Sequence, residues 1–284
     1  MIKLSRIAGR FLGIAALTIV NSALAELVKP LEVGIVPNVS THALFAAYQP
    51  MRLYLEQRLG RPVILRTAPD FRTFYDRTNK GDYDLAITPP HLAKLAETEA
   101  GYVPLTTYQN ELSALLLVAE DGPIKTVADL RGKSIGMPDL LALAGMAGRH
   151  WLEQRGLKAG TDYTLRITAP HNTAVLSVIR GDTDAAIVGS GPYQLMPAKL
   201  RAGVRILVNM GTVINATFMA HSRLSADERV QIKEALLAFG NESPEGQKFV
   251  LDNGFGGMKS LSSRDLKTMD SYTREAKSLL QSTK

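Results

Sequence analysis

Gly81-Asp-Tyr-Asp-Leu-Ala-Ile87 joins a sharp turn to a short apolar strand, and about one hundred residues later Gly181-Asp-Thr-Asp-Ala-Ala-Ile187 repeats this design. Each copy follows a predicted helix and precedes a loop that contains proline. Two copies of one pattern at this separation predict two similar lobes rather than one large sheet. The sequence has no compact repeat of the kind that builds solenoids.

The residues before the first copy alternate between predicted strands and helices. Leu31–Pro37 is a short apolar run ended by proline, and 62–66 is a second strand. Apolar residues at three- and four-residue steps predict a helix over 45–59, which Gly60 ends, and a more polar helix covers 70–80. This β-α-β-α-β order predicts an α/β lobe with a largely parallel sheet.

The second copy has the same surroundings. We expect strands over 133–136 and 164–168 and helices over 140–154 and 172–180. Another signal lies in Ser225-Ala-Asp-Glu228, a capping box that opens a helix over 229–240.

Strand-like segments between the copies and after them predict two crossings between the lobes. Leu112–Ala119 is an apolar run at the first crossing, and 204–209 and 216–220 would return the chain. The crossings predict a paired-strand hinge beside a ligand cleft. The predicted division is residues 26–110 with 212–284 for lobe 1 and residues 111–211 for lobe 2.

The N-terminal segment has the features of a signal peptide. Lys3, Arg6 and Arg10 precede an apolar stretch over 11–20, and Ala23-Leu-Ala25 offers small residues for cleavage. The apolar stretch is shorter than the roughly 20 residues that span a bilayer. We therefore predict cleavage of residues 1–25 and a periplasmic location.

Composition excludes several classes of function. Three of the 33 Lys and Arg residues precede residue 26, so the remaining chain carries 30 − 27 = +3 charges, too few to suggest nucleic-acid binding. The chain has no Cys, which excludes disulfides, thiolate metal sites and a lipid-anchored lipoprotein. Motifs for metals, dinucleotides and P-loops are also missing, so no metal or cofactor is predicted.

Several short stretches, taken in order, resemble one known family. They are Gly34-Ile-Val-Pro37, Leu59-Gly-Arg-Pro62, the run 123–134 and Glu245-Gly-Gln-Lys248 with Gly254-Phe255. From Leu31 to about Asp270 the chain resembles the periplasmic phosphate/phosphite/phosphonate-binding proteins of ABC transporters. The resemblance implies a type II periplasmic-binding-protein fold, in which two α/β lobes joined by a two-strand hinge close on a small molecule.

The resemblance also locates a ligand loop that differs here. Relatives hold phosphonate oxygens with a Ser-Thr-Ser-Gly loop at a helix N-terminus, whereas the corresponding run 138–145 has no hydroxyl group. The family's His is kept as His171, followed by Asn172. Backbone N–H groups at the start of the helix predicted from Leu140 would still hold a carboxylate or another anion, and Leu140 with Leu141 would suit an apolar ligand portion.

Polar residues after the first and third predicted strands are further candidates. Asn38, Ser40 and Thr41 follow the first strand, although Ser40 or Thr41 is equally suited to cap the next helix. Thr88 and His91 follow the third strand, and the alternative for His91 is a solvated place in the first turn of a helix.

Three candidates complete the set. Tyr108 precedes the first crossing and either lines the hinge side of the cleft or packs in the core. Asp139 either faces the cleft or caps a helix. Ser190 follows the second repeated strand, where the resemblance implies a ligand contact in relatives.

These features predict a monomeric solute-binding protein that delivers a small, anionic ligand to a membrane ABC permease by hinge closure. The alternative is a ligand-sensing subunit for a membrane histidine kinase. A hydrolase is the remote alternative, because the chain has no Gly-x-Ser-x-Gly nucleophile elbow.

Overall fold

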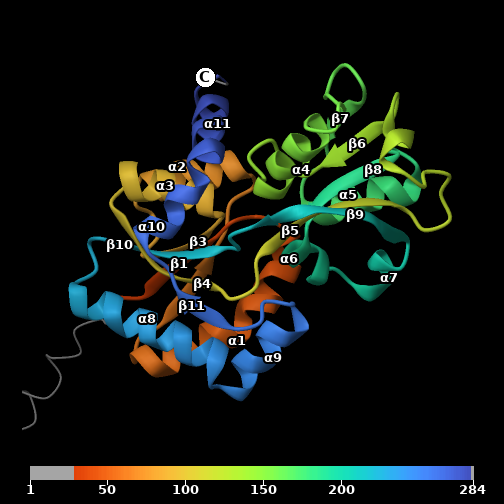
Figure 1. Ribbon diagram of the computed structural model, residues 1–284. Coiled ribbons are helices and arrows are strands. Elements are labelled where there is room, and N and C mark those ends of the chain that lie inside the picture. Colours follow the sequence, from red (N-terminus) through yellow and green to blue (C-terminus); the bar gives the residue numbers. More distant parts are fainter. Residues whose placement is uncertain (1–28, 283–284) are drawn as a thin grey trace, which may run out of the picture.

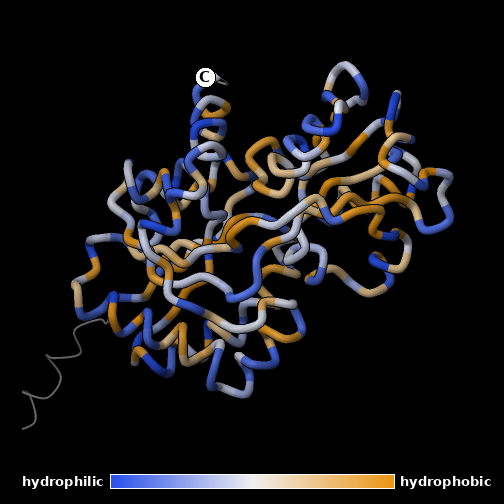
Figure 2. The backbone as a smooth tube through the Cα atoms, in the orientation of Figure 1, coloured by the Kyte–Doolittle hydropathy of each residue, from blue (hydrophilic) through white to orange (hydrophobic). Residues whose placement is uncertain are grey.

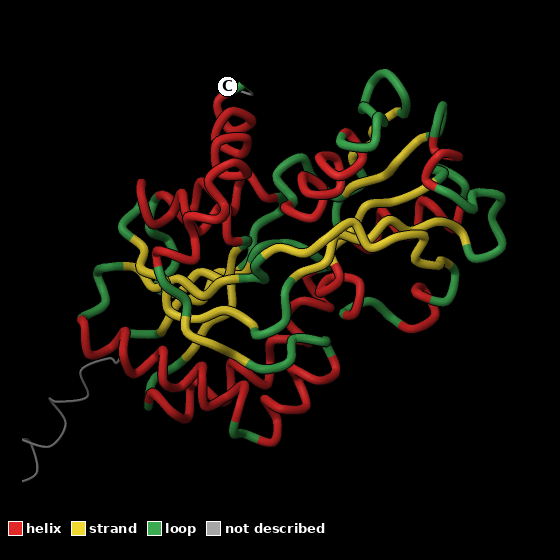
Figure 3. The backbone as a smooth tube through the Cα atoms, viewed as in Figure 1, coloured by secondary structure: helices red, strands yellow, loops and turns green. Residues whose placement is uncertain are grey.

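The structure, a computed structural model, describes residues 29–282 and has two β-sheets flanked by helices (Figures 1 and 3). The larger sheet, in lobe 1, has the strand order β11-β4-β10-β3-β1-β2. Its strands are β1 (Leu31–Ile35), β2 (Val63–Arg66), β3 (Leu85–Thr88), β4 (Tyr102–Tyr108), β10 (Thr217–His221) and β11 (Met258–Ser260). The predicted strands near residues 31, 62 and 85 are confirmed, whereas the sequence pattern did not predict β4 and β11.

The second sheet, in lobe 2, has the order β7-β6-β8-β5-β9. Its strands are β5 (Leu112–Ala119), β6 (Ser134–Met137), β7 (Thr164–Ile167), β8 (Ala185–Gly189) and β9 (Val204–Val213). In each lobe three neighbouring strands are parallel, β2-β1-β3 and β7-β6-β8, and the adjoining strand is antiparallel. The two copies found in the sequence therefore occupy matching places, since β3 and β8 follow the two Gly-Asp-x-Asp turns.

Helices cover both faces of each sheet (Figure 1). Lobe 1 contains α1 (Thr41–Leu59), α2 (Phe71–Asn79), α3 (Pro90–Glu99), α8 (Ala226–Asn241), α9 (Pro244–Asp252), α10 (Ser263–Leu266), the 3-10 turn η2 (Lys267–Met269) and α11 (Asp270–Gln281). Lobe 2 contains the 3-10 turn η1 (Val127–Leu130), α4 (Leu143–Glu153), α5 (His171–Arg180), α6 (Ser190–Gln194) and α7 (Ala198–Arg201).

Local signals explain where several helices begin and end. Gly60 ends α1 with a φ of 63°, a left-handed conformation that glycine adopts without steric cost. Ser225 and Glu228 form the predicted capping box of α8. The prediction that a helix begins at Leu140 is wrong, because α4 begins at Leu143.

The chain crosses between the sheets twice, from β4 to β5 and from β9 to β10, as the sequence indicates. The two crossings are tied together by Asn215, whose Nδ2 donates to the carbonyl oxygen of Asn110 at 3.0 Å. Apolar segments run through the middle of both lobes (Figure 2). One buried cluster joins the lobes, with Val36, Phe71 and Phe74 of lobe 1 against Leu141 of lobe 2.

The predicted signal peptide lies outside the described residues. Between residues 29 and 282, none of the helices combines the length and the apolar character that crossing a membrane requires.

Candidate ligand site

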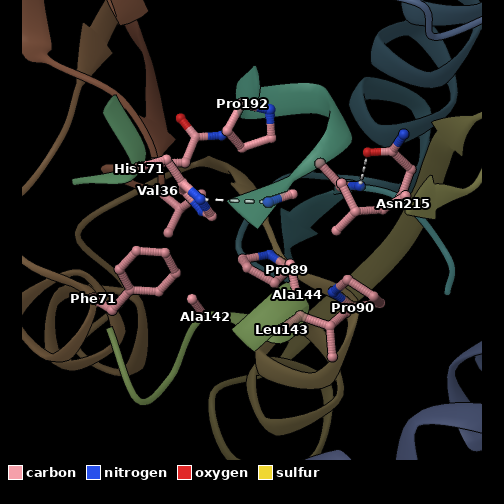
Figure 4. Close-up of a pocket in the computed structure, with 14 residues that line it drawn as sticks. Val36, Phe71, Pro89, Pro90, Ala142, Leu143, Ala144, His171, Pro192 and Asn215 are labelled. Atoms are coloured by element: carbon pink, nitrogen blue, oxygen red, sulfur yellow. Dashed lines mark hydrogen bonds between the residues drawn. The ribbon is translucent and has the colours of Figure 1, made fainter. Parts of the chain in front are cut away.

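A cavity of about 50 Å³ lies between the lobes, where several helices begin (Figure 4). Four of its lining residues are the first residues of helices: Phe71 of α2, Pro90 of α3, Leu143 of α4 and His171 of α5. In Figure 4 His171 lies on one side of the cavity and Asn215 on the other. The full lining is Val36, Asn38, Phe71, Pro89, Pro90, Leu112, Ala142, Leu143, Ala144, His171, Gly189, Pro192, Asn215 and Ala216.

The helix N-termini make this cavity electropositive without a charged side chain. Each N-terminus carries the equivalent of roughly half a positive charge, and its first N–H groups have no intrahelical acceptor. Within residues 29–282, the N–H groups of Leu143, Ala144 and Gly145 have no hydrogen-bond acceptor, because the first bond inside α4 runs from Met146 to the carbonyl of Ala142. Three N–H donors therefore remain at the start of α4.

His171 adds a side-chain donor. The residue is 3% exposed, and its Nδ1 accepts a hydrogen bond from the backbone N–H of Gly189 at 3.4 Å. Burial lowers the pKa of His171 to about 3, so the ring is neutral at ordinary pH. Because Nδ1 is the acceptor, the proton lies on Nε2, which has no partner among the described residues. His171 thus offers an uncharged N–H donor in the cavity wall.

Two asparagines complete the polar lining. The carbonyl oxygen of Asn38, in lobe 1, accepts from the N–H of His171 in lobe 2 at 3.3 Å, while the side-chain Oδ1 of Asn38 is buried without a partner. Asn215 is already occupied, since its Oδ1 accepts from the N–H of Ala216 and its Nδ2 bonds Asn110. Asn38 is therefore the asparagine with hydrogen-bonding capacity left for a ligand.

The other polar candidates after the first strand lie outside the cavity wall. Ser40 and Thr41 are exposed, and the Ser40 hydroxyl accepts from the N–H of Ala43 at the start of α1. This bond matches the capping alternative for Ser40.

Two buried candidates serve the packing of lobe 1. Thr88 is the last residue of β3, and its carbonyl accepts from the hydroxyl of Thr217. Tyr108 is 1% exposed, hydrogen-bonds the hydroxyl of Tyr48 at 3.3 Å and stacks on Phe255. Neither residue lines the cavity, and Tyr108 follows the packing alternative.

The alternative prediction for His91, a solvated place in the first turn of a helix, is wrong in one respect: the side chain is not solvated. It lies in the first turn of α3 but is fully buried, and its Nε2 is 3.0 Å from the carbonyl oxygen of Leu141 in lobe 2. Burial lowers the pKa of His91 to about 4, so the ring is neutral and donates to this carbonyl. His91 is thus a link between the lobes and does not line the cavity.

The loop before α4 lines a neighbouring groove instead. The Asp139 carboxylate accepts from the N–H of Leu141 at 2.8 Å, which closes a turn and delays the start of α4 by three residues relative to the prediction. Burial raises the pKa of Asp139. Leu141 is buried against lobe 1, whereas Leu140 is 38% exposed. All three line a groove of about 380 Å³.

The remaining candidates are close to the cavity without lining it. Asn172 follows His171, and its Oδ1 is buried without a partner. The hydroxyl of Ser190 accepts from the backbone N–H of Ser113 at 2.9 Å. Asn38 and His171 are thus the two predicted site residues that the fold brings together in the cavity wall.

Sequence reasoning missed several lining residues. Phe71 is the first residue of a helix that the sequence predicted without assigning any of its residues to the site, and Asn215 lies in a short connection between strands. The sequence signal that would have found Phe71 is the preceding Asp70, which caps α2 and marks its N-terminus. Among residues 29–282, no group of three or more His, Asp or Glu side chains is placed to hold a metal ion.

Two α/β lobes, a double-strand hinge and a cavity between the lobes define the class of type II periplasmic binding proteins. Residues 33–266 match the sequence model described as ABC transporter, phosphonate, periplasmic substrate-binding protein. The chain belongs to this family of periplasmic substrate-binding proteins, as its resemblance implied.

Solved structures share the fold. A binding-protein component of an ABC phosphonate transporter from Pseudomonas aeruginosa is 13% identical, with a TM-score of 0.76 and 88% coverage of both chains. PhnD1 from Prochlorococcus marinus, in complex with methylphosphonate, is 13% identical with a TM-score of 0.77, over 88% of this chain and 98% of its own.

Sequence relatives extend beyond phosphonate proteins. An Escherichia coli K12 protein provisionally described as an aliphatic sulfonates-binding protein is 27% identical over 240 residues, 79% of this chain and 73% of its own. The tetrathionate sensor histidine kinase TtrS of Salmonella typhimurium is 28% identical over 156 residues, half of this chain but only 26% of the kinase.

Proposed function

We propose that this protein captures a small organic anion in the periplasm, performs no chemistry on it and delivers it to a membrane ABC permease. The observation that carries the proposal is the meeting of four helix N-termini around a cavity that also contains the N–H donor of His171. Unpaired N–H groups at helix N-termini favour negative charge. We also propose that the protein is a monomer, that residues 1–25 are removed on export and that the lobes divide as predicted.

Hinge closure is the proposed mechanism of capture. Asn38 meets His171, and His91 meets Leu141, across the two lobes. Rotation about the crossings near Asn110 would break these contacts and open the cavity to solvent. A ligand that bonds to both lobes would favour the closed arrangement, which presents one defined surface to the permease.

The names of relatives support an anion with a small oxygen-rich headgroup. PhnD1 has been solved with methylphosphonate, and the Escherichia coli relative is described by aliphatic sulfonates. Both ligands combine an anionic head with an alkyl group. The apolar lining of this cavity suits such an alkyl group.

A thermal-shift screen of the exported protein tests the proposal. The panel contains phosphate, alkylphosphonates, alkylsulfonates, carboxylates, neutral sugars and cationic amines. An anion at about one hundred times its Kd stabilises the protein by roughly 2.7 kcal/mol, which raises Tm by about 5–10 °C. A shift only with sugars or amines would contradict the proposal.

Two variants of one residue test whether the cavity is the binding site. His171→Asn keeps an acceptor near the position of Nδ1 but has no donor at Nε2, whereas His171→Gln places an N–H donor there. We expect His171→Asn to reduce the affinity for the best anion of the screen by about tenfold or more, and His171→Gln to reduce it less. Calorimetry measures both affinities. Asn172→Ala is the control from the adjacent position. An equal loss of affinity in all three variants would exclude His171 as a hydrogen-bond donor to the ligand.

A sensing role is the second candidate, because half of the chain matches TtrS. In that case the closed protein would dock onto a membrane histidine kinase instead of a permease. The genes beside this one distinguish the roles, since permease and ATPase genes favour transport and a kinase gene favours sensing.

A further inference from the structure

The charge of the cavity wall limits the charge of its ligand. None of the 14 lining residues is Asp, Glu, Lys or Arg, and the one histidine, His171, is neutral, so the wall has no full positive charge to neutralise an anion. The donors are uncharged: the N–H groups at the start of α4, Nε2 of His171 and the amide of Asn38. The four N-termini supply roughly half a positive charge each, and the Asp70 carboxylate that caps α2 offsets about one unit of that sum, so about one positive charge remains for the ligand.

A second negative charge on the ligand would meet unfavourable neighbours. The Asn38 side chain has an unpartnered Oδ1 but carries no positive charge, so it cannot neutralise a second anionic oxygen. The adjoining groove is lined by Asp70, Asp76 and Asp139 with Arg72 as its basic residue. The Arg72 guanidinium is already committed to the carbonyl oxygens of residues 279 and 280. An uncompensated buried charge is costly, since its hydration is lost.

Cavity size limits the headgroup. One water molecule needs roughly 10–15 Å³ of such space. The cavity of about 50 Å³ therefore holds only a few heavy atoms, such as a carboxylate or sulfonate with a short alkyl group. Pro89, Pro90 and Pro192 contribute no N–H donor to the lining, and ten of the 14 lining residues have apolar side chains, so most of the wall offers carbon to a ligand.

We propose that the cavity selects ligands whose small headgroup carries one negative charge over ligands of the same shape that carry two. Carboxylates, alkylsulfonates and singly ionised alkylphosphonates belong to the favoured class. Phosphate and fully ionised alkylphosphonates belong to the disfavoured class. This inference rests on the proposed function as an anion-binding protein.

Ethanesulfonate and ethylphosphonate form the test pair, because they share a tail and a tetrahedral headgroup. A phosphonate loses its second proton at a higher pH than a phosphate ester does, so calorimetry at about pH 5.5 and about pH 9.5 brackets that loss, while the sulfonate keeps one charge throughout. We expect ethylphosphonate to bind at least about tenfold more weakly at the higher pH and ethanesulfonate to change by less than about twofold.

Each outcome decides between the two proposals. If ethylphosphonate binds equally or more tightly at the higher pH, charge selection is wrong while anion binding stands. If neither these probes nor any anion of the screen binds at either pH, both proposals fail.

A charge-introducing variant tests the cause. Asn38→Lys adds a cation to the cavity wall and removes the unpaired acceptor. At about pH 9.5 it should raise the affinity ratio of ethylphosphonate to ethanesulfonate by about tenfold or more. His42→Lys adds the same charge at an exposed position of α1 and should leave the ratio unchanged. An unchanged ratio in Asn38→Lys would show that the missing cation does not set the preference.

Discussion

Two buried histidines, His91 and His171, perform different tasks through the same property. Both are neutral because burial lowers their pKa values, to about 4 and about 3. Each neutral ring has one donor nitrogen and one acceptor nitrogen. A protonated ring would have two donors and no acceptor. His171 uses its acceptor for Gly189 and keeps its donor for the cavity, whereas His91 donates to Leu141.

These lowered pKa values predict that acid destabilises the fold. Between the folded pKa values and the ordinary value of about 6.5, the unfolded chain binds more protons, so stability is lost as pH falls through this window. From pH 7 to about pH 5 each buried histidine should cost about 2 kcal/mol of unfolding free energy. Urea unfolding across this range measures the loss.

His91→Gln keeps a donor for Leu141 but does not titrate, so it should remove about half of this loss. His42→Gln changes an exposed histidine and should leave the loss unchanged. If the unfolding free energy of wild type and of His91→Gln depends on pH in the same way, buried His91 is not a source of the acid destabilisation.

At the scale of elements, periodicity located most helices and strands but misplaced the start of α4. Asp139 before an apolar run predicted a helix from Leu140, whereas its carboxylate closes a turn and the helix starts at Leu143. No local signal encodes this outcome, because Leu141 is held by residues of the other lobe. Strand-end position predicted Asn38, and strand-end position together with the family resemblance predicted His171. Phe71 carries neither signal, and the fold brings it to the cavity at the N-terminus of α2.

The loop before α4 should therefore couple stability to closure. Leu141→Ala removes a side chain buried between the lobes and should cost about 2–4 kcal/mol. The best anion of the screen should also bind more weakly, because the closed arrangement is less populated. Leu140→Ala, at an exposed neighbour, should stay within about 0.5 kcal/mol of wild type in urea unfolding. Equal effects of the two substitutions would contradict a contact between lobes at Leu141.

At the scale of the whole molecule, α11 provides another link between the lobes (Figure 1). It packs on α3 of lobe 1, where the Thr273 hydroxyl donates to the carbonyl of His91. From the same helix, Glu275 accepts hydrogen bonds from Arg149 and His150 of α4 in lobe 2. These side chains are partly buried, so salt screens the contact less than it screens surface pairs.

Removing this link should shift the molecule toward open forms without unfolding either lobe. Glu275→Ala should increase the radius of gyration measured by small-angle X-ray scattering. It should also reduce the affinity for the best anion by about threefold to tenfold, because the closed arrangement loses roughly 1 kcal/mol of stabilisation. A saturating anion should restore the compact dimensions, since binding energy favours the closed arrangement. Asp252→Ala removes an exposed ion pair within α9 and should change neither quantity. If Glu275→Ala keeps wild-type dimensions and affinity, closure depends on the contacts of Asn38, His91 and Leu141 alone.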